Sequence, residues 1–223
     1  MSEIILFDLD GTLTDPKEGI TKSYQYALSA FGIQESLDDL IQYIGPPLRE
    51  TIANRYGFSP PDVEKAVAKF REYFFDAGIY ENEVYAGIPE LLKTLHGEGK
   101  TMAVATNKVL PAAQKVLEHF CLDRYFAFVS GDDMEGSLTK DGKRNIIRIA
   151  LEAVGAADKS KAVMIGDRKH DVIGAREAGI GSIGVLYGYG SREELAGAGA
   201  AYIADTVEDL KGLLCGGLLL QKK

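Results

Sequence analysis

Cysteine and histidine are scarce in this chain of 223 residues, and tryptophan is absent. The two cysteines, Cys121 and Cys215, stand alone, with no second cysteine or histidine at the spacing of metal ligands. Isolated cysteines are typical of proteins in a reducing compartment, and we expect both to be small buried apolar side chains. The sequence therefore predicts a cytoplasmic protein.

Positive charge is also in the minority, because 25 lysines and arginines face 33 aspartates and glutamates, for a net charge of −8. Nonspecific binding to a nucleic-acid polymer requires a basic surface that displaces counterions, so we expect no nucleic-acid partner. A small phosphorylated ligand would meet a protein of its own sign. Such a ligand requires a metal ion or local lysines and arginines that reverse the field at its site.

Long hydrophobic runs are missing as well. The run Ile4–Phe7 is too short for the core of a signal peptide. The run Leu213–Leu220 is interrupted by Gly216-Gly217 and is too short to cross a bilayer. We expect no membrane-spanning segment, and we expect the C-terminal run to form the last turn of a helix that packs on the body.

Short apolar runs recur along the chain, each followed by a turn and a helical stretch. Most are hydrophobic at every position, which is typical of strands that are covered on both faces. Alternation of strand and helix implies right-handed crossovers, so the sequence predicts an α/β fold with a doubly wound parallel sheet. The expected strands are Ile4–Phe7, Met102–Ala105, Phe126–Val129, Ala162–Ile165, Ile180–Leu186 and Tyr202–Ala204.

The interval between the first two of these runs holds helical signals and no convincing strand. Asp15-Pro16 and Ser59-Pro60-Pro61 are typical helix starts, with Gly32 and Gly78 as the matching stops. We therefore predict an all-helical insert over residues 15–83, with residues 1–14 and 84–223 as the α/β core. Each helix carries one aromatic-rich stripe that we interpret as core packing: Ile20, Tyr24, Leu28 and Phe31 in one, and Val63, Val67, Phe70 and Phe74 in the other.

The strongest group of chemical side chains follows the first expected strand, in the string Asp8-Leu9-Asp10-Gly11-Thr12. Open α/β sheets bind ligands beyond the carboxyl ends of their strands, so we expect Asp8 and Asp10 to face that crevice. Two carboxylates this close repel unless a cation lies between them or one holds a proton. An ionised nucleophile beside a protonated acid is what phosphoryl transfer requires. The alternative interpretation is an acidic turn that caps Gly11.

Two further strings follow later strands. Gly166-Asp167-Arg168-Lys169-His170-Asp171 opens a helix, and its two aspartates can place one carboxylate on a hard cation and the other behind it. Thr106-Asn107-Lys108 offers a hydroxyl and backbone N–H groups to phosphate oxygens, although a threonine here is often only a helix cap. Lys140 and Lys143 lie before an expected helix that begins near Arg144. Either lysine is a candidate for the fixed cation that a phosphate site needs.

In their order, these motifs resemble the four motifs of haloacid dehalogenase-type hydrolases, over essentially the whole chain. The helical insert after the first motif is similar to the cap of the phosphoglycolate phosphatase and β-phosphoglucomutase branch. The lysine motif departs from the Lys-Pro form common in that branch. The string that begins at Lys143 is closer to a subgroup in which lysine precedes Glu/Asp-Val-Ile, so we favour Lys143 over Lys140.

The resemblance implies a chemistry for the first and fourth motifs. Asp8 attacks phosphorus and becomes an aspartyl phosphate, while Asp10 gives a proton to the leaving group and later removes one from water. Mg²⁺ is the implied cofactor, bound by the Asp8 carboxylate, the Asp10 backbone carbonyl and Asp167, with Asp171 oriented behind it. Alignment and charge neutralisation are the main requirements of such a reaction.

The resemblance also implies the residues that bind substrate. Thr106, Asn107 and Lys143 are expected to hold the phosphoryl oxygens. Arg49, after Gly45-Pro46-Pro47, resembles the cap loop that covers the site in this family, and we predict that it binds a second anionic group of the substrate. The alternative is an exposed arginine at a helix N-terminus.

The sequence thus predicts a Mg²⁺-dependent phosphatase that acts on a small phosphorylated metabolite, phosphoglycolate-like or nucleotide-like, as a monomer or homodimer. A phosphomutase of the β-phosphoglucomutase type and a pyrophosphatase are the alternatives. A non-catalytic scaffold is disfavoured because every motif position is filled. Dehalogenation is disfavoured because it needs no proton from Asp10.

Overall fold

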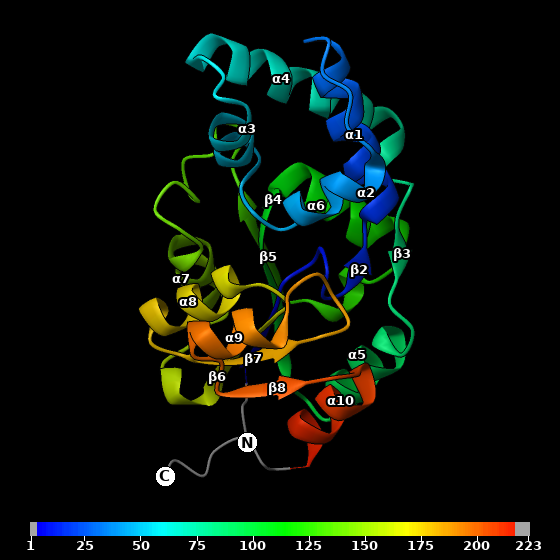
Figure 1. Cartoon of the computed structure of the whole chain (residues 1–223). Helices are drawn as coiled ribbons and strands as arrows, with labels where there is room; N and C mark the ends of the chain where they lie inside the picture. Colours follow the sequence, from blue (N-terminus) through cyan, green and yellow to red (C-terminus); the bar gives the residue numbers. More distant parts are fainter. Residues whose placement is uncertain (1–3, 217–223) are drawn as a thin grey trace.

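The computed structural model describes residues 4–216, in which six parallel strands form one sheet in the order β5-β4-β1-β6-β7-β8 (Figure 1). Every neighbouring pair is parallel, so the predicted doubly wound α/β fold is confirmed. The first strand lies in the middle of the sheet, between β4 and β6. The strands are β1 (Ile4–Phe7), β4 (Thr101–Val109), β5 (Phe128–Asp132), β6 (Ala162–Gly166), β7 (Gly181–Val185) and β8 (Tyr202–Ala204).

Helices cover both faces of the sheet, as its continuously apolar strands require. Ile5 and Phe7 of β1 belong to the core under one face, and Leu6 belongs to the core under the other. The first face is covered by α5 (Ile88–Gly97), α6 (Leu110–His119) and α10 (Val207–Cys215), and the second by α7 (Arg144–Ala153), α8 (Lys169–Ala178) and α9 (Arg192–Ala198). Short 3₁₀ turns at Asp123–Tyr125 and Lys159–Lys161 complete this part.

The segment after β1 is mainly helical and lies beyond the carboxyl ends of the strands (Figure 1). Ser59 caps the longest of its helices by accepting a hydrogen bond from the Asp62 backbone N–H at 3.4 Å. Both predicted stripes face inward, and of their eight members only Phe31 is more than slightly exposed. The elements are α1 (Lys17–Ser29), α2 (Leu37–Leu40), a 3₁₀ turn (Ile41–Tyr43), α3 (Leu48–Tyr56), α4 (Pro60–Tyr73) and a π-helical turn (Phe74–Gly78).

The expectation that no strand lies in this interval was wrong. β2 (Thr14–Asp15) and β3 (Glu83–Val84) pair antiparallel, with Thr14 opposite Val84 and Asp15 opposite Glu83. Two-residue strands carry too few positions for a hydrophobic pattern to reveal them. They form because the chain leaves the sheet and returns to it at the same place. The division into a core and a cap at residues 15 and 83 stays a prediction.

The interpretation of the cysteines as buried was also wrong. Cys121 is exposed in the turn after α6, where its φ of 54° lies in the left-handed region, and Cys215 is half-buried in the last turn of α10. The rest of the C-terminal run, from Gly217 on, lies outside the described residues. Among the helices of residues 4–216, none has the length and apolar character needed to cross a membrane.

Candidate active site

The site is built around the carboxyl end of β1, where Asp8 is the first residue beyond the strand. One carboxylate oxygen, Oδ1, accepts a hydrogen bond from the Leu9 backbone N–H at 2.7 Å. The other, Oδ2, lies 2.8 Å from Lys143 Nζ. Because β1 is central in the sheet, the ends of β4 and β6 bring their own side chains beside this carboxylate.

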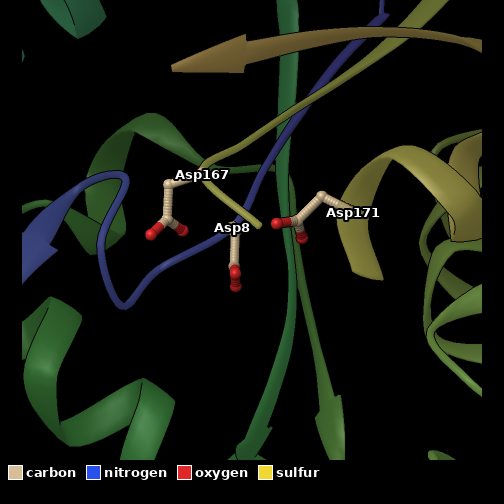
Figure 2. Close-up of side chains that lie close together, drawn as sticks. All are labelled: Asp8, Asp167 and Asp171. Carbon is tan, nitrogen blue, oxygen red and sulfur yellow. The ribbon is translucent and has the colours of Figure 1, made fainter. Parts of the chain in front are cut away.

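Two further carboxylates converge on Asp8 (Figure 2). Asp167 follows β6 and Asp171 lies in the first turn of α8, and one oxygen from each of the three residues lies within 4.8 Å of the others. Small residues make this approach possible. A Cβ on Gly11, whose φ is +85°, would lie 2.3 Å from Asp167 Oδ2, and a Cβ on Gly166 would lie 2.1 Å from Asp171 Cγ.

Asp8, Asp167 and Asp171 together form what we call the acidic cluster. The negative charge of this cluster favours the binding of a cation. Burial, with Asp171 and Asp8 nearby, raises the pKa of Asp167 well above its ordinary value. Burial also raises the pKa of Asp171 to about 6, against the opposing effect of Lys143. Three buried carboxylates and one lysine carry a formal charge of −2 when all are ionised. A hard divalent cation with oxygen ligands therefore fits this donor set.

The structure places Lys143, rather than Lys140, against the carboxylates. Lys143 is the N-cap residue of α7; its side chain has no exposed surface, and Nζ lies 2.5 Å from Asp171 Oδ1 as well as beside Asp8. Burial disfavours its charged form, but Asp171 and Asp8 outweigh that effect, so the pKa of Lys143 is raised. Lys140 is exposed at the rim of the neighbouring cavity.

Asp10 is buried beside the acidic cluster but faces a different partner. Its Oδ2 lies 2.5 Å from Lys108 Nζ, and its buried Oδ1 has no hydrogen-bond partner among residues 4–216. Burial raises the pKa of Asp10, with Lys108 opposing the rise. Lys108 was not among the residues predicted to act in the site. The available signal was its place in the string Thr106-Asn107-Lys108, which is part of β4 in the structure.

The other two residues of that string differ in what they contact. Thr106 is buried on the cavity wall, and its Oγ1 accepts a hydrogen bond from the Lys108 backbone N–H at 3.3 Å. Asn107 reaches across to the segment before α3, where Nδ2 donates to the Gly45 backbone oxygen at 3.1 Å. The role of both residues in phosphate binding stays a prediction.

A cavity of about 490 Å³ opens over Asp8 and Asp10. Its floor includes Asp8, Asp10, Thr106, Asn107 and Lys108. Its roof comes from the helical segment and is rich in aromatic rings, of which Tyr43 and Phe75 are half-buried and the rest almost fully buried. The aromatic residues that line the cavity are Tyr24, Tyr43, Phe70, Phe74 and Phe75.

Arg49 lies at the start of α3 and lines the same cavity, but much of its hydrogen-bonding capacity is occupied. Nε and Nη2 lie 2.7 and 2.8 Å from the two carboxylate oxygens of Glu64. Nη1 donates to the Met134 backbone oxygen at 3.1 Å, and Arg71 donates to the same oxygen at 2.7 Å. Glu64 was not predictable as the partner of Arg49, because the two residues lie on different helices.

A loop after β7 also reaches the site without having been predicted. The Tyr189 backbone N–H donates to Asp167 Oδ2 at 2.8 Å, and the Tyr189 hydroxyl donates to Asp15 Oδ1 in β2. Tyr189 thus contacts both a carboxylate of the acidic cluster and the start of the helical segment. The only signal in the sequence was the alternation Tyr187-Gly188-Tyr189-Gly190.

Comparison with known proteins places this geometry in a family. The family model for haloacid dehalogenase-like hydrolases matches residues 5–185. The chain is 47% identical to a 5'-nucleotidase of Pseudomonas aeruginosa over 86% of each chain. It is also 34% identical to the tyrosine-protein kinase PtkA of Mycobacterium tuberculosis, over 95% of this chain and 72% of that protein.

Among solved structures, a predicted phosphatase from Clostridium acetobutylicum superposes with a TM-score of 0.93 at 43% identity, covering 97% of this chain and 99% of that one. The chain therefore belongs to the haloacid dehalogenase-like hydrolases. Within them it is a phosphatase.

Proposed function

We propose that the protein is a Mg²⁺-dependent phosphomonoesterase that works through an aspartyl phosphate on Asp8. An oxygen of Asp8 attacks phosphorus while the bond from phosphorus to the ester oxygen breaks, and Asp10 gives its proton to that oxygen. Water then attacks phosphorus of the aspartyl phosphate while the bond from phosphorus to the Asp8 oxygen breaks. Asp10 takes a proton from that water, and inorganic phosphate and the Asp8 carboxylate are released. The raised pKa of Asp10 suits a group that must be protonated in the first step.

Thr106 and Lys143 are the proposed ligands of the transferring phosphoryl oxygens, since Thr106 lines the cavity together with Asp8 and Lys143 Nζ lies 2.8 Å from Asp8 Oδ2. The acidic cluster fits a Mg²⁺ ion by charge and donor type, with Asp8, Asp167 and the Asp10 backbone carbonyl as proposed ligands. When bound, the ion supplies positive charge that neutralises the phosphoryl oxygens. Asp171 is the carboxylate that holds Lys143 in position from the other side.

One observation carries this proposal: Asp8 and Asp10 are buried carboxylates on the cavity floor, and Asp10 Oδ1 has no partner in the described part of the chain. Asp132 offers the contrast. It is also buried on the cavity wall, but its oxygens accept hydrogen bonds from the backbone N–H groups of Asp133 and Leu138 and from the Thr139 hydroxyl. Asp132 is therefore occupied in holding a turn, whereas Asp10 keeps one oxygen, Oδ1, without a partner among the described residues.

A nucleoside 5'-monophosphate is the substrate class that the cavity favours over phosphoglycolate. A volume of about 490 Å³ lies within the range for sites that enclose drug-sized ligands. Aromatic roof residues such as Tyr43 and Phe75 can contact a planar base, which phosphoglycolate lacks. The P. aeruginosa relative is named a 5'-nucleotidase, in agreement with this class.

The helical segment, residues 15–83, is the proposed cap that reads the leaving group. Its residues form the aromatic roof, whereas the proposed chemistry belongs to strand ends of the sheet. Lid closure over such a site excludes water from the reaction. The oligomeric state, monomer or homodimer, and the cytoplasmic location stay predictions.

The test is a hydrolysis panel with purified protein in Mg²⁺ and in EDTA. It contains nucleoside 5'-monophosphates, phosphoglycolate, β-glucose 1-phosphate and pyrophosphate, with Asp8→Asn protein as the blank. We expect Mg²⁺-dependent release of phosphate, fastest from a nucleoside 5'-monophosphate. Turnover of the sugar phosphate only with a bisphosphate activator would instead establish the phosphomutase alternative. Preference for pyrophosphate would establish the pyrophosphatase alternative.

A further inference from the structure

We propose that Lys108 is a positioning residue for Asp10. Its ammonium group holds the carboxyl group of Asp10 in one orientation, and Phe74 of the helical segment contacts the ammonium group in turn. This inference rests on the proposed function, because it assigns a role in the proton transfer that Asp10 performs there.

The first observation is how the two lysines of the site divide the carboxylates between them. Lys143 Nζ lies within 2.8 Å of oxygens of both Asp8 and Asp171. Lys108 Nζ lies 2.5 Å from Asp10 Oδ2, and the two side chains are only 6% and 11% exposed. Each lysine therefore serves a different step: Lys143 serves the nucleophile, and Lys108 serves the proton donor.

The second observation is the orientation that this contact imposes. Lys108 fixes Oδ2, while Oδ1 is buried without a partner among the described residues, and the Asp10 side chain lines the cavity floor. A carboxyl group held by a single charge-assisted hydrogen bond keeps one rotamer instead of several. The carboxyl group is thereby held in one orientation at the cavity floor before the substrate arrives.

The third observation connects Lys108 to the roof of the cavity. Lys108 Nζ lies 4.6 Å from the centre of the Phe74 ring, within the range of a cation–π contact. Phe74 opens the π-helical turn after α4, so this lysine contacts the sheet's acid on one side and the helical segment on the other. The position of the helical segment is thus transmitted to the orientation of Asp10.

The charge balance of the step agrees with this role. The ester oxygen leaves phosphorus with the bonding electron pair and takes the proton from the Asp10 carboxyl group. Asp10 then carries a negative charge in a buried site, and Lys108 Nζ, 2.5 Å from Asp10 Oδ2, compensates that charge. Lys108 needs no contact with the substrate in this scheme.

The experiment compares two substrates that differ in their need for a proton: a nucleoside 5'-monophosphate, whose alkoxide is a poor leaving group, and p-nitrophenyl phosphate. For Lys108→Met we expect kcat on the nucleotide to fall roughly 10- to 100-fold, the range of a lost charged hydrogen bond. We expect KM for the nucleotide, and kcat on the aryl ester, to change by less than about threefold, because neither depends on proton transfer. Lys108→Arg should recover part of the loss, since it keeps the charge.

A double-mutant cycle with Asp10→Asn isolates the positioning role. In the Asp10→Asn background, Lys108→Met should cost almost nothing further on the nucleotide, because the acid it serves is gone. Lys140→Met is the matched control, since it removes a lysine from the rim of the same cavity without touching Asp10. Thermal unfolding and inhibition by inorganic phosphate check that the fold and the phosphoryl site are intact.

The outcomes separate this inference from the proposed function. If the wild type hydrolyses both substrates but Lys108→Met raises KM for both, Lys108 binds substrate and the positioning role is wrong. Equal losses of kcat on both substrates also overturn it. So does a Lys108→Met effect on kcat that is as large in the Asp10→Asn background as in the wild type. If the wild type hydrolyses neither substrate, the proposed function fails, and the role of Lys108 fails with it.

Discussion

The floor and the roof of the cavity are built from opposite kinds of side chain. The floor carries the carboxylates of Asp8 and Asp10, each within 2.8 Å of a lysine: Lys143, buried behind Asp8, and Lys108 beside Asp10. The roof consists mainly of aromatic rings on helices, with arginines at its rim. Under the proposed function, the floor carries the reaction at phosphorus, whereas the roof selects the molecule that is presented to it.

The largest effect that tests this comparison is loss of the nucleophile. Asp8→Asn keeps the size of the side chain but removes its nucleophilic charge, so we expect turnover of every phosphate ester to disappear while circular dichroism and the unfolding midpoint persist. Wild-type protein should bind beryllofluoride with Mg²⁺, as a mimic of the aspartyl phosphate. Substantial activity in pure Asp8→Asn protein would contradict the assignment of the floor.

The next largest effect is expected from loss of Lys143, the lysine that contacts the acidic cluster. Lys143→Ala leaves Asp8 and Asp171 without their shared cation, and we expect kcat/KM to fall roughly 100- to 1000-fold, as for the loss of one stabilising group at a developing charge. Lys140→Ala, at the exposed rim, should cost less than about threefold. Steady-state kinetics of the two variants on one substrate makes the comparison, and the reverse order would refute the choice between the lysines.

A third prediction concerns metal and pH. Burial raises the pKa of Asp167, so the metal-free protein gains stability from the protonated group at low pH and loses it as pH rises through the folded-state pKa. A bound Mg²⁺ ion supplies positive charge beside the ionised carboxylate and so stabilises the folded protein. Calorimetry with Mg²⁺ or EDTA should therefore show a larger Mg²⁺-induced rise in Tm near pH 8 than near pH 5. In Asp167→Asn protein most of that rise should vanish; an undiminished rise would place the ion elsewhere.

The roof should respond differently from the floor. Tyr43 is half-buried on the cavity wall and packs against Tyr24 with ring centroids 5.8 Å apart. Tyr43→Ala removes a ring that can contact the base, and we expect KM for a nucleoside 5'-monophosphate to rise about 3- to 10-fold, the scale of one aromatic contact. Methyl phosphate, which reaches only the floor, serves as the control substrate. A matching loss with methyl phosphate would mean that Tyr43 supports the floor instead.

The smallest expected effect is that of Arg49. Its guanidinium is paired with Glu64 at a partly exposed position, and such pairs contribute little. For a nucleoside 5'-monophosphate, which has no second anionic group, Arg49→Ala should change KM less than about threefold. A phosphomonoester that also carries a carboxylate is the informative comparison. If that substrate alone weakens strongly, Arg49 reads a second anion, and the substrate class proposed above needs revision.

Much of the fold was predictable because its signals are local. The apolar runs marked all six strands of the sheet to within a few residues, and Ser59-Pro60 marked the start of α4. Strand ends in a parallel sheet share one edge, so the convergence of Asp8, Asp167 and Asp171 also followed from their positions after β1 and β6. The features that depend on local sequence patterns were therefore predictable.

The residues that were missed all depend on contacts between distant segments. Lys108 meets Asp10 from 98 positions away, and Glu64 meets Arg49 across two helices. The sequence does not distinguish a lysine that is buried against a carboxylate from one that is exposed. Only the packing of the helical segment on the sheet distinguishes them, and no periodicity reports that packing.

The short ribbon of β2 and β3 has a consequence for engineering. The chain leaves the sheet and returns to it through two antiparallel strands that pair residue to residue, Thr14 with Val84 and Asp15 with Glu83. The two junctions are therefore separated by the spacing of a strand pair, about 4.5–5.5 Å between Cα atoms. Any segment that replaces the residues between them has to bridge that distance at its two ends, so this ribbon is the place at which to graft a two-residue hairpin turn or a helical segment from another protein.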